Sequence, residues 1–171
     1  EFSKTLPSIL PENVAVETSF SADAGLCFID QKQFIHTLFS LIENSRDAMP
    51  NGGALRIRTS LVDLDDARAG PFSGATPGVY ACVSVGDSGT GIPSDVLPRI
   101  FEPFFTTKDV GRGTGLGLPT VLGIAQQHEG FVDVSSEPGS GAEFRVILPL
   151  ANATGPSTAR PPPIAPLPGR G

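Results

Sequence analysis

The distribution of glycine constrains this chain more than any other feature of its sequence. Seven of its 20 glycines lie between Gly86 and Gly117, in two short clusters. The first cluster directly follows a stretch of alternating apolar residues, and the second leads directly into a helical pattern. Glycine permits turns and close backbone approach that other residues do not. We therefore predict that the two clusters are functional loops on a folded domain.

Charge and hydropathy exclude several classes of protein. The 171 residues carry 12 basic and 18 acidic side chains, a net charge of −6, which does not favour binding to nucleic acid. Every apolar run is shorter than the roughly 18 residues that a membrane span requires. The start of the chain shows no pattern of a secretory signal. We expect a cytoplasmic domain that does not contact a membrane.

Cysteine and histidine are rare and scattered. Cys27 and Cys82 both lie in apolar stretches, which favours reduced thiols in the core over a disulfide or a metal site. His36 and His128 do not complete a zinc-binding spacing with them. The sequence therefore predicts a core without disulfide or zinc.

The apolar pattern predicts both strands and helices. Strands are predicted over residues 14–20, 26–29, 54–61, 79–85, 131–135 and 144–148. Helices are predicted over residues 31–49, 93–100 and 118–128, with Asp30 as the first N-cap and Gly130 as the last C-cap. Residues 62–78 and 101–117 are predicted to be loops. The predicted fold class is α+β, with one mixed sheet covered by about three helices.

The end of the chain differs in composition from the rest. Six of the 17 prolines lie within the final 21 residues, and no apolar periodicity continues after Leu150. Such a composition is typical of an extended linker or a disordered tail. We predict one folded domain over residues 1–150 and a Pro-rich tail over residues 151–171.

Asp87 is the first candidate for ligand binding. It opens the segment Asp87-Ser-Gly-Thr-Gly91, at the end of the predicted strand 79–85. A carboxylate can accept a hydrogen bond from an exocyclic amine such as that of adenine, and Gly89 and Gly91 let the backbone approach a flat ring. The same residues also suit an ordinary Asx-type turn. Alone, the segment leaves both interpretations open.

The second glycine cluster, Gly111-Arg-Gly-Thr-Gly-Leu-Gly117, immediately precedes a predicted helix. Its backbone N–H groups and the helix N-terminus could bind an anion, and its glycines permit a mobile lid. The segment lacks the Lys-Ser/Thr ending of a P-loop, and no strand directly precedes it as a dinucleotide fingerprint requires. A flexible surface loop is the alternative.

Asn44 is a candidate metal ligand. It lies inside the predicted helix 31–49, where asparagine is a poor helix former. Its amide oxygen could bind Mg²⁺ together with phosphate and water oxygens. A polar residue on the helix surface, without any ligand, is the alternative.

The order of these segments resembles the catalytic ATP-binding domain of bacterial sensor histidine kinases, in the superfamily that includes the gyrase and MutL ATPases. Residues 38–49 resemble the N box, 85–93 the G1 box, 100–108 the F box, 111–118 the G2 box and 137–149 the closing hairpin. The resemblance covers residues 5–149. It implies a two-layer α/β sandwich of the Bergerat (GHKL) type with a flexible ATP lid.

The resemblance implies a role for each matching residue. Asn44 would bind Mg²⁺, and Asp87 would bind the adenine amine of ATP. Lys108 would neutralise phosphate charge, with Arg46 and Arg112 as weaker candidates. Aromatic packing would anchor the lid through Phe101, Phe104 and Phe105. The other nucleotide-binding residues implied are Asp47, Gly89, Gly91, Ile92, Gly113, Thr114, Gly115, Leu116, Gly117 and Leu118, of which those from 113 onwards would use backbone N–H groups.

Two positions depart from the superfamily pattern. Ser40 stands where its ATPases place a glutamate four residues before the Mg²⁺ asparagine, and Glu43 points about 100° away around the helix. Water needs such a base, whereas a neutral histidine already carries a free lone pair near pH 7. Transfer to histidine is thus favoured over hydrolysis. Ala142 replaces a common threonine of the closing hairpin, which puts a water-mediated adenine contact in doubt.

Neither histidine of the chain has the surroundings of the phosphoacceptor histidine of this family. His36 precedes a threonine, and His128 is better placed to end a helix. The sequence therefore predicts a histidine kinase domain that binds Mg·ATP and phosphorylates a separate dimerisation domain, with a response-regulator receiver domain as an indirect partner. The alternatives are a regulatory nucleotide-binding module without transfer activity and a gyrase- or MutL-like ATPase.

Overall fold

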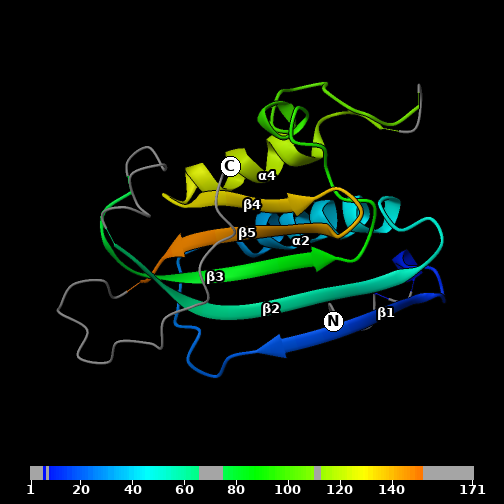
Figure 1. The fold of residues 1–171 in the computed structure, drawn as a ribbon. Helices are drawn as coiled ribbons and strands as arrows, with labels where there is room; N and C mark the ends of the chain where they lie inside the picture. The colour runs from blue at the N-terminus through cyan, green and yellow to red at the C-terminus, as the bar shows by residue number, and fades with distance from the viewer. Residues whose placement is uncertain (1–5, 7, 66–74, 110–112, 152–171) are drawn as a thin grey trace.

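A single five-stranded sheet forms the framework of the domain. The computed structural model describes residues 6, 8–65, 75–109 and 113–151, so the predicted tail lies almost wholly outside the described residues. The strands are β1 (Val14–Phe20), β2 (Gly53–Leu64), β3 (Gly78–Asp87), β4 (Phe131–Glu137) and β5 (Gly141–Pro149). Their order in the sheet is β1-β2-β3-β5-β4 (Figure 1). Only β1 and β2 pair in parallel, so the predicted mixed sheet is confirmed.

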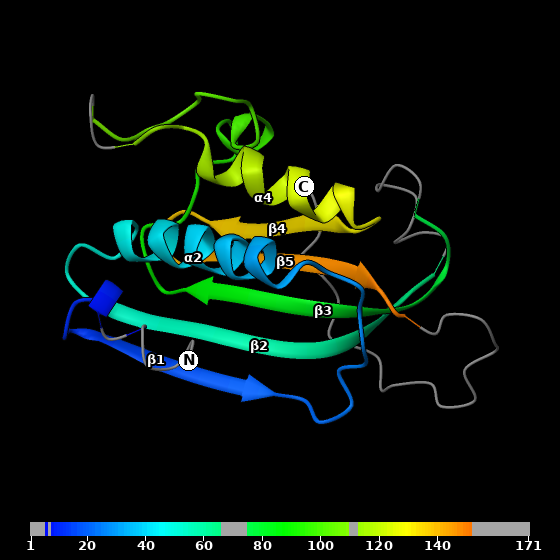
Figure 2. The same ribbon diagram turned by 180° about the vertical axis from the view of Figure 1, so that it is seen from behind.

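Two α-helices, α2 (Gln31–Asp47) and α4 (Gly117–Gln127), cover one face of this sheet. Figure 2 looks onto that face, with both helices in front of the strands. Asp30 caps α2 as predicted, because its Oδ1 accepts a hydrogen bond from the Gln33 amide at 2.9 Å. Among the described residues, no helix combines the length and the apolar character needed to cross a bilayer.

The core lies between the helices and the sheet. Alternate residues of the strands face the helices, so that Leu55 and Ile57 of β2 and Val85 of β3 are completely or almost completely buried. Leu41 and Ile42 of α2 cover them and are fully buried. The predicted helical spacing of apolar residues therefore corresponds to the buried face of α2. This packing fixes the ends of α2 and β3, where the predicted ligand-binding residues lie.

The end of α4 is a compact C-terminal motif. His128 follows the helix directly, as predicted, and its Nδ1 lies 2.8 Å from the Ile124 carbonyl oxygen. Its Nε2 accepts a hydrogen bond from the Asp30 amide at 3.2 Å, which joins this end of α4 to the start of α2. The C-cap is His128, and not Gly130 as predicted, and the residue after it, Glu129, is left-handed with φ of 58°. Gly130 instead donates its amide to the Ala125 carbonyl at 2.8 Å.

Three predicted elements differ in the structure. Residues 26–29 are not a strand: Leu26 and Phe28 are 75% and 82% exposed, so their apolar character does not reflect burial. The strand predicted to end at residue 61 continues to Leu64, because Leu64 and Val62 pack on the outer face of the sheet. Only the 3₁₀ turn η1 (Leu97–Arg99) forms within residues 93–100. The described residues thus hold fewer long helices than predicted.

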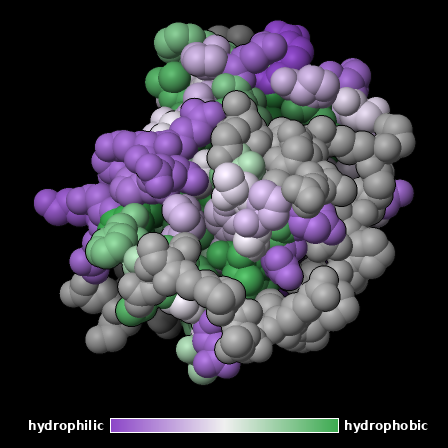
Figure 3. Space-filling view, turned by 90° about the vertical axis from the view of Figure 1, so that its left-hand side faces the viewer, coloured by the Kyte–Doolittle hydropathy of each residue, from purple (hydrophilic) through white to green (hydrophobic). Residues whose placement is uncertain are grey.

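The segment that contains the exposed residues 26 and 28 follows β1, at the end of the sheet where that strand finishes (Figure 1). Figure 3 looks at this end, where hydrophobic groups lie between hydrophilic ones.

The two cysteines differ in their surroundings. Cys27 is half-buried, whereas Cys82 is buried in the outer apolar cluster of the sheet, and burial raises its pKa to about 11. The prediction of a core thiol is confirmed for Cys82.

Candidate functional site

A cavity of about 550 Å³ opens where the C-terminal half of α2, the end of β3 and the start of α4 meet. This volume is within the range of small-molecule sites. Most of the predicted nucleotide-binding residues line it: Asn44, Asp47, Asp87, Gly91, Ile92, Lys108, Gly113, Thr114, Gly115, Gly117 and Leu118. The other four, which are Gly89, Phe101, Phe104 and Leu116, are not part of its lining. Gly111 and Arg112 lie outside the described residues.

Asp87 forms the inner wall of this cavity. It is the last residue of β3 and is 6% exposed. Its Oδ1 accepts hydrogen bonds from the amides of Gly89 at 2.9 Å and Ala142 at 3.3 Å. Burial raises the pKa of Asp87, and the hydrogen bonds from these two amides oppose the shift. The carboxylate is therefore held in one orientation, and it keeps acceptor capacity for a ligand amine.

The glycines of the first cluster are required by close backbone contacts. A Cβ at residue 89 would overlap the carbonyl group of Ala48, at the end of α2. Gly91 has φ of +69°, and a Cβ there would overlap the carbonyl of Glu137. Thr90 donates its amide to the Ala48 carbonyl at 3.0 Å. Gly89 thus fixes the turn against α2, while Gly91 forms part of the cavity wall.

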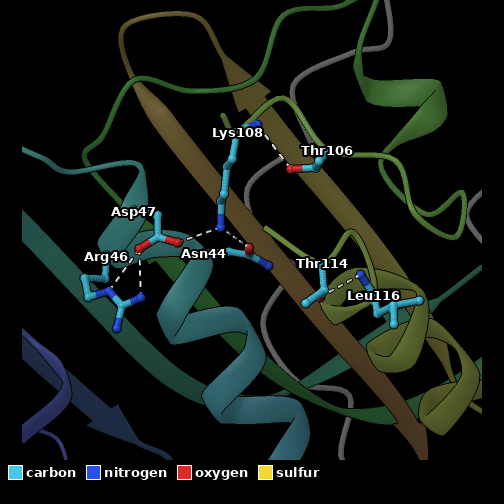
Figure 4. Close-up of polar contacts among 7 residues, drawn as sticks. All are labelled: Asn44, Arg46, Asp47, Thr106, Lys108, Thr114 and Leu116. Atoms are coloured by element: carbon cyan, nitrogen blue, oxygen red, sulfur yellow. Dashed lines mark hydrogen bonds and ion pairs between the residues drawn. The ribbon is translucent and has the colours of Figure 1, made fainter. Parts of the chain in front are cut away.

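Four polar side chains meet at the opposite wall (Figure 4). Lys108 extends from the lid segment toward α2, where its Nζ lies 3.3 Å from Asn44 Oδ1 and 2.6 Å from Asp47 Oδ2. Arg46 contacts the other oxygen of Asp47 at 2.9 Å. Partial burial raises the pKa of Asp47, but the hydrogen bonds and charges of Lys108 and Arg46 outweigh it and leave the pKa below its usual value.

The glycine-rich segment brings a helix N-terminus to the same cavity. α4 begins at Gly117, and the first-turn N–H groups of a helix have no acceptor within it. A Cβ at Gly117 would lie 3.9 Å from Asn44 Nδ2, so the start of α4 is adjacent to the candidate metal ligand. Thr114 Oγ1 accepts the amide of Leu116 at 3.3 Å. An anion bound here would lie beside both Asn44 and Lys108.

The three phenylalanines of the lid have different surroundings. Phe101 packs against the core, and Phe105 lines the cavity with the Arg99 guanidinium 4.2 Å from its ring centroid. The predicted packing of Phe104 is wrong, since its side chain is 76% exposed. Its φ of 66° and the hydrogen bond from its amide to the Gly115 carbonyl turn the side chain outward. The backbone of Phe104, and not its side chain, therefore joins the segment around residue 104 to the segment around residue 115.

Two further positions on α2 adjoin the cavity. Ser40, in place of the glutamate of the ATPases, lines the cavity and is almost buried. Glu43 was predicted to point away around the helix, yet it also borders the cavity, as an exposed residue. Glu43 and Asp47 are the two acidic side chains of α2 in the described lining of the cavity. The sequence spacing alone did not indicate this position.

Ser45 is the functional residue that sequence reasoning missed. It is 1% exposed. Its hydroxyl acts on Asp87 as a hydrogen-bonding group, which lowers the pKa of that carboxyl. The apolar periodicity of α2 placed Ser45 on the buried face. The periodicity could not show that the end of β3 lies beside it.

We predict that Ser45→Ala shifts the pH dependence of nucleotide binding. Loss of the hydroxyl raises the pKa of Asp87 further, so ADP affinity falls at a higher pH on acidification than in the wild type. Because the hydroxyl favours the ionised carboxylate, the free energy of unfolding should fall by about 1 kcal/mol at pH 7. Calorimetry with ADP between pH 5 and 8, together with urea unfolding, measures both effects. An unchanged pH profile contradicts the role of Ser45.

Comparison with known proteins identifies the family. A family model described as histidine kinase-, DNA gyrase B- and HSP90-like ATPase matches residues 29–152. The chain belongs to this family. The matched residues include α2, β2, β3, α4, β4 and β5, and therefore every element around the cavity. The resemblance inferred from the four boxes is thus confirmed, and so is an ATP-binding domain.

Curated relatives are sensor kinases. The chain is 41% identical over 144 residues to the sensor kinase CckA of Brucella abortus, which covers 84% of this chain and 15% of CckA. It is 36% identical over 140 residues to sporulation kinase C of Bacillus subtilis, covering 81% of this chain and 28% of that kinase. The chain therefore spans less than a third of the length of either relative. These matches indicate the catalytic domain of a sensor kinase.

Solved structures confirm the fold. The mycobacterial sensor histidine kinase MprB matches with a TM-score of 0.66 at 22% identity, covering 86% of this chain and 91% of that one. Full-length ShkA in complex with AMPPNP matches with a TM-score of 0.66 at 24% identity, covering 91% of this chain and 30% of ShkA. The α+β sandwich predicted from the sequence is therefore that of histidine kinase catalytic domains.

Proposed function

We propose that this domain binds Mg·ATP and transfers the γ-phosphate to a histidine on a separate dimerisation domain of the same kinase. One observation carries the proposal: a single cavity brings together a buried carboxylate, a helix N-terminus and a polar pair of asparagine and lysine. These are the groups that a base, a phosphate chain and a metal ion require. The similarity to sensor kinases, and to a ShkA structure that contains AMPPNP, supports it.

Each end of the nucleotide has a matching wall. Asp87 would accept the adenine amine through the carboxylate oxygen that the Gly89 and Ala142 amides leave free. The backbone N–H groups of residues 113–118 would bind the phosphates at the start of α4. Lys108 would add a positive charge at the same place. The nucleotide would therefore lie along the cavity from β3 to α4.

Asn44 fits the role of metal ligand. Its Oδ1 lies in the cavity and already accepts a hydrogen bond from a cation, the Lys108 ammonium. A carbonyl-type oxygen suits Mg²⁺, which keeps several waters and is bound in part through substrate phosphates. When bound, the metal neutralises charge on the phosphate oxygens. Asn44 and the start of α4 would then hold the γ-phosphate in one orientation.

The acceptor must come from outside the described cavity. His128 is engaged at the end of α4, and His36 does not line the cavity. In the proposed transfer, a neutral imidazole nitrogen of the partner domain forms a bond to the γ-phosphorus. The bond from that phosphorus to the bridging oxygen breaks, and ADP leaves with the electron pair. With Ser40 in place of a glutamate, position 40 offers no base for water.

The test uses this chain, a separately produced dimerisation domain of the same kinase and radiolabelled ATP. We expect label on the dimerisation domain, dependent on Mg²⁺ and on its histidine. Label on this chain would contradict the proposal. Steady hydrolysis of ATP without transfer would indicate a gyrase-like ATPase instead. Binding of nucleotide without either reaction would indicate a regulatory module.

We also propose a further partner and a location for this domain. A response-regulator receiver domain would take the phosphoryl group from the histidine and would not contact this cavity. We propose a cytoplasmic position, where ATP is available and free thiols such as Cys27 and Cys82 stay reduced. The net charge of −6, which does not favour nucleic-acid binding, is consistent with this position.

We predict that Phe104 contributes to docking of the acceptor domain. Its exposed ring stands on the lid beside Gly115, close to the phosphate-binding segment. Phe104→Ser should raise the KM for the dimerisation domain about tenfold, as the loss of an aromatic anchor does at an interface, without changing ADP affinity. Phe28→Ser is the matched control, because Phe28 is similarly exposed but lies between β1 and α2, outside the lid. Equal effects of both variants contradict the prediction.

A further inference from the structure

The ammonium group of Lys108 is held by two side chains of α2. Its Nζ lies 2.6 Å from Asp47 Oδ2 and 3.3 Å from Asn44 Oδ1 (Figure 4). The side chain is 32% exposed, so this contact is partly screened from water. At the backbone, the Lys108 amide donates to Thr106 Oγ1 at 3.1 Å, which fixes where the side chain starts. The lid is therefore tied to α2 through one cation.

Asp47 is shared between two cations. Arg46 contacts one carboxylate oxygen and Lys108 the other, from opposite sides. Asp47 is also the last residue of α2, where a negative charge is unfavourable beside the C-terminal carbonyl groups. A carboxylate at this position is thus stabilised by its two partners rather than by the helix. Its observed contacts are all with side chains that face the cavity.

The same lysine also borders the phosphate-binding segment. A Cβ at Gly113 would lie 3.1 Å from Lys108 Cδ, so the stem of the lysine runs alongside that segment. Its ammonium is engaged by Asp47, so an interaction with phosphates would compete with that ion pair. The ammonium must also leave Asn44 Oδ1 before a metal ion can use that oxygen, because two cations at one oxygen repel each other.

Given the proposed function, we propose that Asp47 is a positioning residue that competes with the nucleotide for Lys108. While the Lys108–Asp47 ion pair is formed, the ammonium covers Asn44 and holds the lid against α2. Binding of phosphate transfers the ammonium from Asp47 to the nucleotide and uncovers Asn44 for the metal. Nucleotide affinity therefore contains the cost of breaking this ion pair.

The first test detects the Lys108–Asp47 ion pair in the absence of nucleotide, by the rate at which Lys108 is labelled. The chain has three lysines, Lys4, Lys32 and Lys108. Acylation with an N-hydroxysuccinimide ester requires an accessible amine nitrogen, and the contact with Asp47 shields that of Lys108. In the wild type we expect slow labelling of Lys108 relative to Lys32, which is exposed on α2. Asp47→Asn should raise this ratio about fivefold, the upper range for a partly exposed pair. Asp47→Glu should restore it.

The second test measures ADP affinity by calorimetry, with and without Mg²⁺. Asp47→Asn should tighten ADP binding about fivefold without the metal, because Lys108 is no longer held. This gain should vanish in the Lys108→Gln background, since Asp47 acts through that lysine. Urea unfolding verifies that the variants are folded.

Several results would overturn the inference. Weaker ADP binding of Asp47→Asn would show that Asp47 contacts the nucleotide or its metal directly. The same gain with and without Lys108 would show an effect of charge alone, and no change in either test would show that the ion pair is not coupled to binding. If the wild type binds no ADP, the proposed function fails and this inference fails with it, whereas a failed inference leaves wild-type binding intact.

Discussion

Asp87→Asn is expected to weaken ADP binding by about 100-fold or more, because a charge-assisted hydrogen bond is lost and a donor replaces the acceptor. The asparagine oxygen can still accept the amides of Gly89 and Ala142, which are the partners of Oδ1. Its NH₂ group then takes the place of the other carboxylate oxygen. An adenine amine would meet this donor and find no acceptor. Calorimetry with ADP measures the loss.

The sharpest control for Asp87→Asn is a change of base. IDP presents an oxygen where ADP presents its amine, so the variant NH₂ can donate to it. We therefore expect the preference for ADP over IDP to decrease strongly or to reverse. Equal loss of both nucleotides would show that Asp87 only supports the fold, and would contradict the assignment of the adenine site.

The stability of Asp87→Asn distinguishes a role of Asp87 in adenine binding from a role in supporting the fold. Burial raises the pKa of Asp87 above its value in the unfolded chain. Such a carboxyl favours the folded state below the unfolded pKa, and this contribution is lost as pH rises through the folded pKa. At pH 7 the ionised form therefore carries a cost that asparagine avoids. Urea unfolding at pH 7 should show a variant at least as stable as the wild type, with a smaller difference at acid pH.

Local sequence signals predicted most of the framework. The alternation in β2 and β3 and the three- and four-residue spacing in α2 follow directly from which side chains are buried. The glycine clusters also predicted their loops correctly, because Gly91 needs a positive φ and a backbone contact that other residues cannot make. Family resemblance then supplied chemical roles that spacing alone left open.

The remaining differences concern contacts between distant segments. Leu26 and Phe104 are apolar yet exposed, and nothing in their neighbouring residues indicates this. The contacts of Lys108 with Asn44 and Asp47 join residues more than 60 positions apart. Ser45 likewise acts on Asp87 only because α2 crosses the end of β3. Such pairings follow from the sheet order and the placement of helices, which local patterns do not encode.

Two sets of contacts position the lid beside the cavity. The lid meets α2 through Lys108 and closes on itself through the hydrogen bond from the Phe104 amide to the Gly115 carbonyl. Gly115 has φ of +65°, and a Cβ there would overlap the backbone of Phe104. The glycine-rich segment proposed to bind phosphate is thus located by backbone contacts that tolerate no side chain. Under the proposed function, Lys108 and a cation at Asn44 would supply the positive charge beside it.

Asn44→Ala is the second variant with a large expected effect. It should reduce phosphotransfer by about 100-fold or more, since the oxygen proposed to hold the metal is removed and charge on the phosphates is no longer neutralised in place. The ratio of ADP affinities with and without Mg²⁺ should fall toward one. Transfer of radiolabel to the dimerisation domain and calorimetry with ADP measure the two effects.

The helix itself should tolerate Asn44→Ala. Alanine is the better helix former by several tenths of a kcal/mol, and Asn44 is only half-buried on α2. Asn51→Ala, in an exposed turn outside the cavity lining, is the matched control and should leave both measurements unchanged. Asn44→Asp keeps an oxygen ligand, so it should retain more of the Mg²⁺ dependence than alanine does. If Asn44→Ala keeps the full Mg²⁺ dependence, the metal is held elsewhere and the assignment of Asn44 is wrong.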